Sequence, residues 1–188
     1  MGPSPEPAAA QQAGQTPPGA VAVVVGMGRV YAVSGVLLLA TAIGGVLLFS
    51  RLWGAQGEQA GWIFWPLVVA GIVVHEGLHG LAMVLCGVPP GEVRFGIQVS
   101  RGAAFATTRR PLSVGAYRFV LVLPLLLLGL APLAVGLAIG NALVVKLGTF
   151  MVAGAGGDVA VLLALRRVGG TASVMDHPSE PGCYVLPG

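Results

Sequence analysis

Residues 62–88 read WIFWPLVVAGIVVHEGLHGLAMVLCGV, and this stretch decides the fold class. It is apolar along its whole length apart from the cluster formed by His75, Glu76 and His79. An α-helix needs about 20 consecutive apolar residues to cross the hydrocarbon core of a bilayer, and this stretch is longer. The sequence therefore predicts a transmembrane helix that carries ionisable side chains at membrane depth.

Three further stretches are long and apolar enough to span a bilayer. They cover residues 30–49, 119–140 and 147–165, and the only charged side chain within them is Asp158. The prediction is an all-α membrane protein with about four transmembrane helices. Pro124 and Pro132 lie within the third stretch, where we expect them to bend the helix.

The composition of the 188 residues agrees with this class. Hydrophobic residues make up 55% and charged residues 9%, whereas an ordinary soluble domain has roughly 25% charged residues. So few charges exclude a soluble globular protein, and so much apolar mass excludes a disordered chain. The basic residues form no patch interleaved with aromatic side chains, so we expect no nucleic acid as a partner.

The segment between the second and third stretches has a different pattern. Residues 93–99 alternate between large apolar side chains and polar or small ones, which is typical of a β-strand. A turn at residues 100–102 and a returning strand at residues 103–108 complete a short β-hairpin-like insert. A plain amphipathic loop is the alternative. Upstream of the first stretch, residues 21–27 are expected to lie at the membrane interface or to add a strand.

The domain organisation follows from these assignments. Residues 1–20 are rich in Pro, Ala, Gln and Gly and are predicted to be a disordered tail. Residues 21–166 form the membrane-embedded domain, and residues 167–188 form a cytoplasmic C-terminal tail. The orientation rests on the excess of Lys and Arg in cytoplasmic loops, because eight of the ten basic residues fall on the side of both termini. We therefore expect a multi-pass protein of the plasma membrane. The eight residues are Arg29, Arg94, Arg101, Arg109, Arg110, Arg118, Arg166 and Arg167.

The ionisable cluster in residues 62–88 has the spacing of a zinc site. His75 and His79 are four residues apart, so both imidazoles project from one face of a helix and can bind one metal ion. Glu76 follows the first histidine and can act as general base on a metal-bound water, as in the HExxH pattern. The alternative is a pair of histidines that pack between helices and hydrogen-bond to Glu76.

Asp158 is the candidate for a third zinc ligand. His79 lies nine residues from the end of its stretch, about 13–14 Å in depth, and Asp158 lies seven residues from the end of its own, about 10–11 Å from the same side. The glycines at positions 154, 156 and 157 would allow close helix packing there. A channel-lining or helix-capping carboxylate is the alternative. Asp176, His177 and Cys183 lie in the C-terminal tail, which we expect to be solvated; an approach of these residues to the membrane mouth is the alternative.

These residues resemble a known family. The run HEGLHG at 75–80, YRFVLVLPL at 117–125, GGD at 156–158 and the later DHP tail at 176–178 are similar to a bacterial family of zincin peptidases first described as a domain of unknown function. The intramembrane cluster also resembles the site-2 proteases, which are intramembrane zinc metalloproteases. The resemblance implies that His75, His79 and Asp158 bind Zn²⁺ and that Glu76 is catalytic. Asp158 is followed by Val159, whereas site-2 proteases usually have glycine there.

The expected function is that of a zinc-dependent intramembrane metalloprotease, a hydrolase that cleaves peptide bonds of membrane-associated proteins or peptides. The expected partners are such a substrate and the lipid bilayer. Two other classes fit the same residues: a membrane zinc-binding adaptor or sensor without catalysis, and an ion transporter. The absence of an internal repeat argues against the transporter.

The charge bias makes the topology testable. Reporter domains fused after Gly57 and after Gly188 should give opposite readouts of sidedness, because an odd number of spans separates the two positions in the four-span arrangement. Identical readouts from the two fusions would contradict that arrangement.

Overall fold

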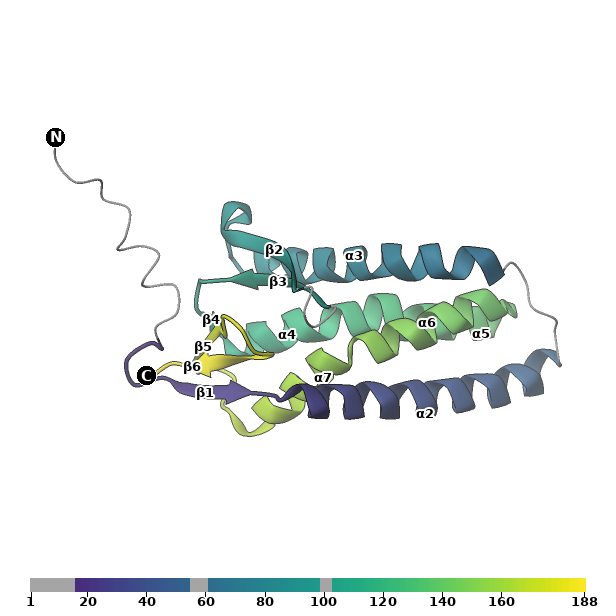
Figure 1. The fold of residues 1–188 in the computed structure, drawn as a ribbon, viewed down its shortest axis with the longest axis horizontal. Coiled ribbons are helices and arrows are strands. Elements are labelled where there is room, and N and C mark those ends of the chain that lie inside the picture. Colours follow the sequence, from purple (N-terminus) through teal and green to yellow (C-terminus); the bar gives the residue numbers. More distant parts are fainter. Residues whose placement is uncertain (1–15, 55–60, 99–102) are drawn as a thin grey trace.

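Four helical segments run side by side along the long axis of the protein (Figure 1). The computed structural model describes residues 16–54, 61–98 and 103–188. Most of the predicted N-terminal tail and the predicted hairpin turn at residues 100–102 lie outside the described residues. A small sheet closes one end of the helices, and the last strand leads to the C-terminus there (Figure 1).

The first three segments match the predicted helices. They are α2 (Met27–Trp53), α3 (Gly61–Leu85) and a segment from Val114 to Ile139. By length and composition each is able to cross a membrane. The third comprises α4 (Val114–Pro124), the π-helix η4 (Leu125–Leu130) and α5 (Ala131–Ile139). The π-helix lies between Pro124 and Pro132, where proline removes backbone donors from the helical ladder.

The fourth segment differs from the prediction of one continuous helix over residues 147–165. It consists of α6 (Ala142–Gly154) and α7 (Gly156–Ala164), bent by 41° and followed by the short helix η5 (Leu165–Arg167). Ala155 lies at the break with φ −76° and ψ 8°, outside the helical range. This stretch is rich in glycine, and apart from proline no residue is less favourable in a helix interior. The break therefore lies where the helix is intrinsically weakest. The bend gives α7 its own first turn, which contains Asp158.

The predicted hairpin is confirmed by two antiparallel strands. After the turn η2 (Pro90–Glu92), β2 (Val93–Gln98) pairs with β3 (Ala103–Thr108), and Val93 lies opposite Thr108. Both strands contact α3. Across the open end of the hairpin, Arg110, which follows β3, donates two hydrogen bonds to Glu92, which precedes β2, at 2.7 and 3.0 Å. This exposed ion pair lowers the pKa of Glu92 below its usual value.

A second sheet makes the all-α prediction incomplete and corrects the prediction of a solvated tail. Its order is β1 (Val21–Val24), β6 (Gly182–Val185), β5 (Ser173–Asp176) and β4 (Leu112–Ser113), with every neighbouring pair antiparallel. The two C-terminal strands bury Val174, Cys183 and Tyr184. Residues 167–188 are therefore folded onto the helices. The strand alternative for residues 21–27 is confirmed by β1.

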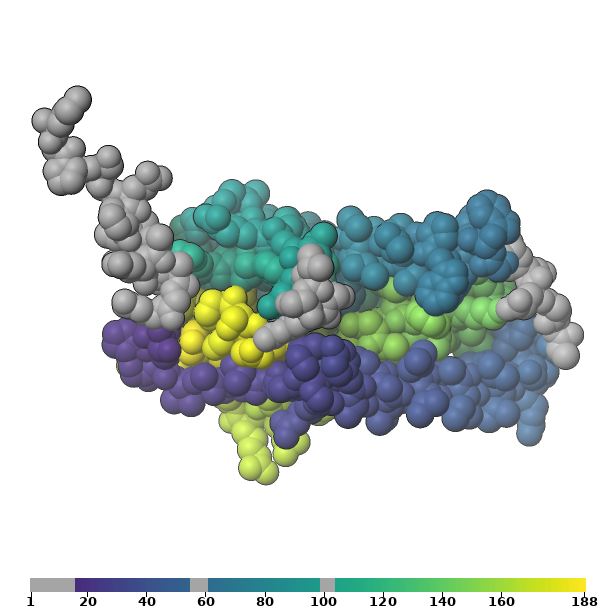
Figure 2. All heavy atoms as spheres, viewed as in Figure 1, coloured from purple at the N-terminus to yellow at the C-terminus, as the bar shows by residue number. Residues whose placement is uncertain are grey.

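The main buried core lies where this sheet meets the helices. Side chains from α3, α4, α7, β5 and β6 contribute to it, including Met83, Val120, Val161, Val174 and Cys183. The outer faces of α2 and α3 expose many large apolar side chains, as lipid-facing helices do. In the space-filling view the C-terminal hairpin fills the space between the β2–β3 hairpin and the start of α2 (Figure 2).

Gly156 determines how closely α7 approaches α2. A methyl group at this position would lie 2.7 Å from the Cα of Ser34 and 2.8 Å from its Cβ, so only glycine fits without movement of the helices. Gly154, two residues earlier, has open space around it. The close helix packing predicted from the glycines therefore depends on Gly156.

We predict that Gly156→Ala lowers the free energy of unfolding by about 1–3 kcal/mol, because overpacking a close contact forces the backbone to shift. Gly154→Ala is the matched control and should be neutral or slightly stabilising, since alanine favours helix more than glycine does. Thermal unfolding of the purified variants in detergent measures both effects. Equal melting temperatures for the two variants would contradict this account of the α2–α7 contact.

Candidate metal centre

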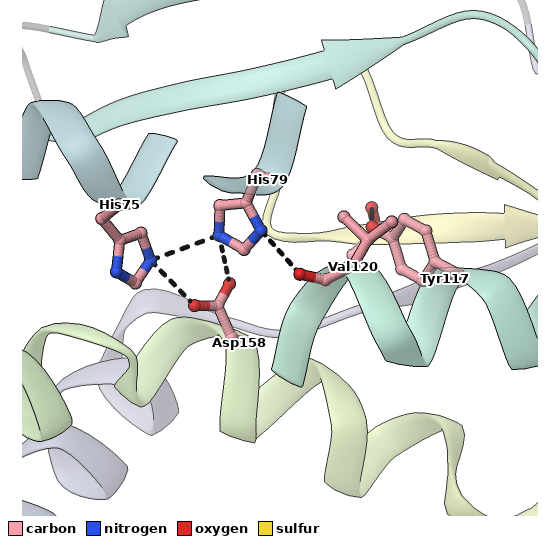
Figure 3. A network of polar contacts seen from close by, with 6 residues as sticks. His75, His79, Tyr117, Val120 and Asp158 are labelled. Carbon is pink, nitrogen blue, oxygen red and sulfur yellow. Dashed lines mark hydrogen bonds and ion pairs between the residues drawn. The ribbon is translucent and has the colours of Figure 1, made fainter. Parts of the chain in front are cut away.

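His75 and His79 lie on one face of α3, one turn apart, as the sequence predicted (Figure 3). Both are buried, with 9% and 7% of their surface exposed. Their Nε2 atoms are 3.2 Å apart, and the ring planes are inclined by 76°. Two buried imidazoles therefore direct nitrogen atoms toward one point.

Asp158 faces this point from the first turn of α7 (Figure 3). One carboxylate oxygen, Oδ2, lies 3.1 Å from His75 Nε2, and the other, Oδ1, lies 3.4 Å from His79 Nε2. The helix break at Ala155 and the contact of Gly156 with Ser34 hold this turn in place. The structure thus brings together the three side chains that the sequence selected from different helices.

The spacing of the three groups fits zinc. Tetrahedral ligands at about 2.0–2.1 Å from Zn²⁺ lie about 3.3 Å from each other. The separations of 3.1, 3.2 and 3.4 Å are close to this value. Two imidazoles and one carboxylate are also a ligand set that zinc takes in catalytic sites, where the fourth position stays open for water.

The backbone of α4 fixes the orientation of His79. Its Nδ1 lies 2.9 Å from the carbonyl oxygen of Val120, and this nitrogen must donate because a carbonyl only accepts (Figure 3). In the neutral ring, Nε2 then carries the free lone pair and points to His75 and Asp158. Such a hydrogen bond to the outer nitrogen is the usual support of a metal-binding histidine.

Glu76 lies beside the three groups without belonging to them. It is partly buried and lines the same cavity of about 820 Å³ as His75, His79 and Asp158. The backbone N–H of Ala106 in β3 contacts its carboxylate. The hairpin therefore reaches the glutamate, and the cavity extends from the histidines along β3.

The C-terminal hairpin lines the opposite part of this cavity, through residues 175–182. Asp176 is largely buried and its Oδ2 accepts hydrogen bonds from Thr107 Oγ1 at 2.8 Å and Thr108 N at 2.9 Å. Burial raises the pKa of Asp176, although these donors and the Tyr117 hydroxyl oppose the shift. Burial, together with Asp176, raises the pKa of Cys183 to about 12, so this thiol stays protonated.

His177 lies in the same hairpin, where its side chain stabilises the turn. Its Nδ1 accepts hydrogen bonds from the backbone N–H groups of Ser179 at 3.3 Å and Glu180 at 2.9 Å. Three or more His, Cys, Asp or Glu side chains that lie close together could hold a metal ion. Within residues 16–54, 61–98 and 103–188, the group of this kind consists of His75, His79 and Asp158. Their ligand atoms all lie within 4.8 Å of one another.

Sequence reasoning missed the groups that support this centre from outside. Val120 contributes its backbone carbonyl, so no pattern of side chains in the sequence predicts this contact. Thr107 and Thr108 end a predicted strand, and nothing in their spacing links them to Asp176 at the far end of the sequence. The one usable signal was Asp176 itself, an acidic side chain that directly follows the apolar residues Val174 and Met175.

The geometry agrees with a match to a family model. Residues 68–172, more than half of the chain, match the family described as "Putative zincin peptidase". The chain belongs to this family. No curated protein and no solved structure matches the chain.

Membership of the zincin peptidase family assigns the chain to the metallopeptidases, and it implies a zinc cofactor. The matched region contains His75, Glu76, His79 and Asp158. It ends just before β5, so the strand that carries Asp176 lies outside it.

The cluster predicts the metal content. The purified protein should contain about one zinc per chain, and His79→Ala or Asp158→Ala should each lose most of it, because two remaining ligands hold zinc weakly. His177→Ala is the matched control, since this third histidine has its ring nitrogen engaged in a turn. Asp176→Ala and Cys183→Ala should also keep the metal. Elemental analysis of each variant measures the ratio. Full zinc occupancy in Asp158→Ala would place the third ligand elsewhere.

Proposed function

We propose that this protein is an intramembrane zinc metalloprotease of the site-2-protease type, which hydrolyses peptide bonds of membrane-associated proteins. The observation that carries the proposal is the convergence of His75, His79 and Asp158 beside Glu76. These groups lie on helices whose remaining surface is apolar. Ionisable residues at such depth are costly and mark functional sites.

The proposed chemistry divides roles among four side chains. His75, His79 and Asp158 would hold the zinc, which when bound supplies a Lewis acid and lowers the pKa of a coordinated water toward 7. Glu76, which lines the same cavity, would serve as general base for the attacking water and would then donate the proton to the leaving amine. The whole centre would be neutral: the charges of the Asp158 and Glu76 carboxylates balance a divalent cation, and both imidazoles are neutral, which suits an apolar surrounding.

A substrate must present an extended backbone to this centre, because the carbonyls of an intact helix are hydrogen-bonded internally. The β2–β3 hairpin offers a way to hold it by strand addition. The backbone N–H of Ala106 turns toward Glu76 and that of Thr108 toward Asp176, so this edge of β3 points away from β2 and into the cavity. The edge next to the metal centre thus belongs to β3.

The proposed setting is the plasma membrane. Three helices are long and apolar enough to cross a bilayer, and the bent pair α6–α7 supplies a fourth span if it crosses as one unit. With four spans, the sheet formed by β1, β4, β5 and β6 lies on the side of both ends of the described chain. The excess of arginine on that side supports a cytoplasmic location for the sheet.

Glu76→Gln tests the catalytic role. The amide keeps the shape of the side chain but cannot accept the proton, so cleavage should fall by about 10²–10⁴-fold while zinc stays bound. Glu92→Gln is the matched control, because Glu92 is an exposed glutamate that is paired with Arg110 and is not among the residues that line the cavity. The measurement is cleavage of single-span membrane proteins co-expressed with each variant, followed by blotting for the shortened product.

Two outcomes would contradict the proposal. Equal cleavage by the wild type and Glu76→Gln would exclude Glu76 as the base. Absence of cleavage by the zinc-loaded wild type across a broad panel of single-span proteins would favour a non-catalytic zinc-binding adaptor or sensor.

A further inference from the structure

Asp176 is a largely buried carboxylate that the proposed mechanism does not use. It ends β5, and its Oδ2 receives one hydrogen bond from the Thr107 side chain and one from the Thr108 backbone. Both donors belong to β3, the strand that lines the cavity beside Glu76. Two hydrogen bonds from neighbouring residues thus converge on one carboxylate oxygen and attach the β2–β3 hairpin to the tail.

The attachment acts on one particular edge of β3. Backbone N–H groups of alternate residues leave a strand on the same side. Thr108 and Ala106 are two residues apart, so the amide that Asp176 holds and the amide that contacts Glu76 share an edge. Fixing Thr108 therefore fixes the direction in which Ala106 and the free edge of β3 point.

Asp176 is itself anchored to the helices. The hydroxyl of Tyr117 contacts its carboxylate and lies 3.4 Å from the carbonyl oxygen of Gly182, to which it donates. Tyr117 is buried in α4, one turn before Val120, whose carbonyl accepts from His79. One short stretch of α4 thus supports the metal centre on one side and the Asp176 attachment on the other.

We infer that Asp176 is a positioning residue of the active centre: by holding Thr107 and Thr108 it keeps the free edge of β3 aligned with Glu76 and the metal cluster, where a peptide backbone pairs. This rests on the proposed function. Asp176 touches neither metal nor substrate in this arrangement and acts only through β3. The inference gives the C-terminal hairpin a part in peptide binding, although its sequence carries none of the zinc-site pattern.

The first arm of the test measures the hold on β3 without any substrate. In amide hydrogen exchange of the full-length protein, Asp176→Ala should speed exchange of residues 103–108 by roughly tenfold or more, because the Thr108 amide loses its hydrogen-bond acceptor. Asp176→Asn should restore much of the protection, since its amide oxygen still accepts. Glu92→Ala is the matched control, a carboxylate at the same hairpin that does not touch this edge.

The second arm measures peptide binding with two zinc-chelating probes. Acetohydroxamate contacts the metal alone, whereas a tripeptide hydroxamate adds a backbone that pairs with β3. In Asp176→Ala we expect zinc content and acetohydroxamate affinity to be unchanged and tripeptide hydroxamate affinity to fall by about tenfold, with recovery in Asp176→Asn. A merely structural role would weaken both probes together.

The outcomes are separable. Unchanged exchange of residues 103–108 in Asp176→Ala overturns the inference, and so does an unchanged tripeptide affinity or an equal loss for both probes. A wild-type protein that binds no zinc refutes the proposed function, while the exchange arm still decides whether Asp176 holds β3. If Asp176→Ala fails to fold, Thr107→Val takes its place under the same criteria, and Thr107→Ser, which keeps the hydroxyl, should behave as the wild type.

Discussion

Asp158 carries a carboxylate into a bundle of apolar helices. In the proposed membrane setting, a lone charge there costs roughly 2.5–3.5 kcal/mol even on the lenient insertion scale. The surrounding structure is arranged to meet this cost. The break at Ala155 gives α7 a first turn of its own, and the contact of Gly156 with Ser34 fixes that turn. His75 and His79 then meet the carboxylate from α3 at 3.1 and 3.4 Å.

Local features of the sequence were enough to predict three of the long helical segments and the β2–β3 hairpin. Long apolar runs identify α2, α3 and the Val114–Ile139 segment because a helix that faces lipid must be apolar over its whole length. The alternation in residues 93–99 identifies β2 for the same local reason. Asp158 could be paired with His79 because the number of residues from the end of a membrane-spanning helix gives the depth of a side chain in the bilayer. Equal depths relate side chains on helices that are far apart in the sequence.

The parts that the sequence did not predict depend on contacts without a local signal. The four-stranded sheet joins β1 to β6 from opposite ends of the chain through strands of two to four residues, too short for a periodic pattern. For this reason the tail was expected to be solvated, although it buries Val174 and Cys183. The support that Val120 gives to His79 comes from a backbone carbonyl, which no residue type encodes.

The central claim is that His75, His79 and Asp158 form one zinc centre, and zinc K-edge X-ray absorption of the purified protein tests it most directly. The account predicts a first shell of nitrogen and oxygen at about 2.0–2.1 Å, with the outer-shell scattering of two imidazoles and no sulfur. A Zn–S distance of about 2.3 Å, which would bring Cys86 or Cys183 into the site, or a single imidazole, would contradict it.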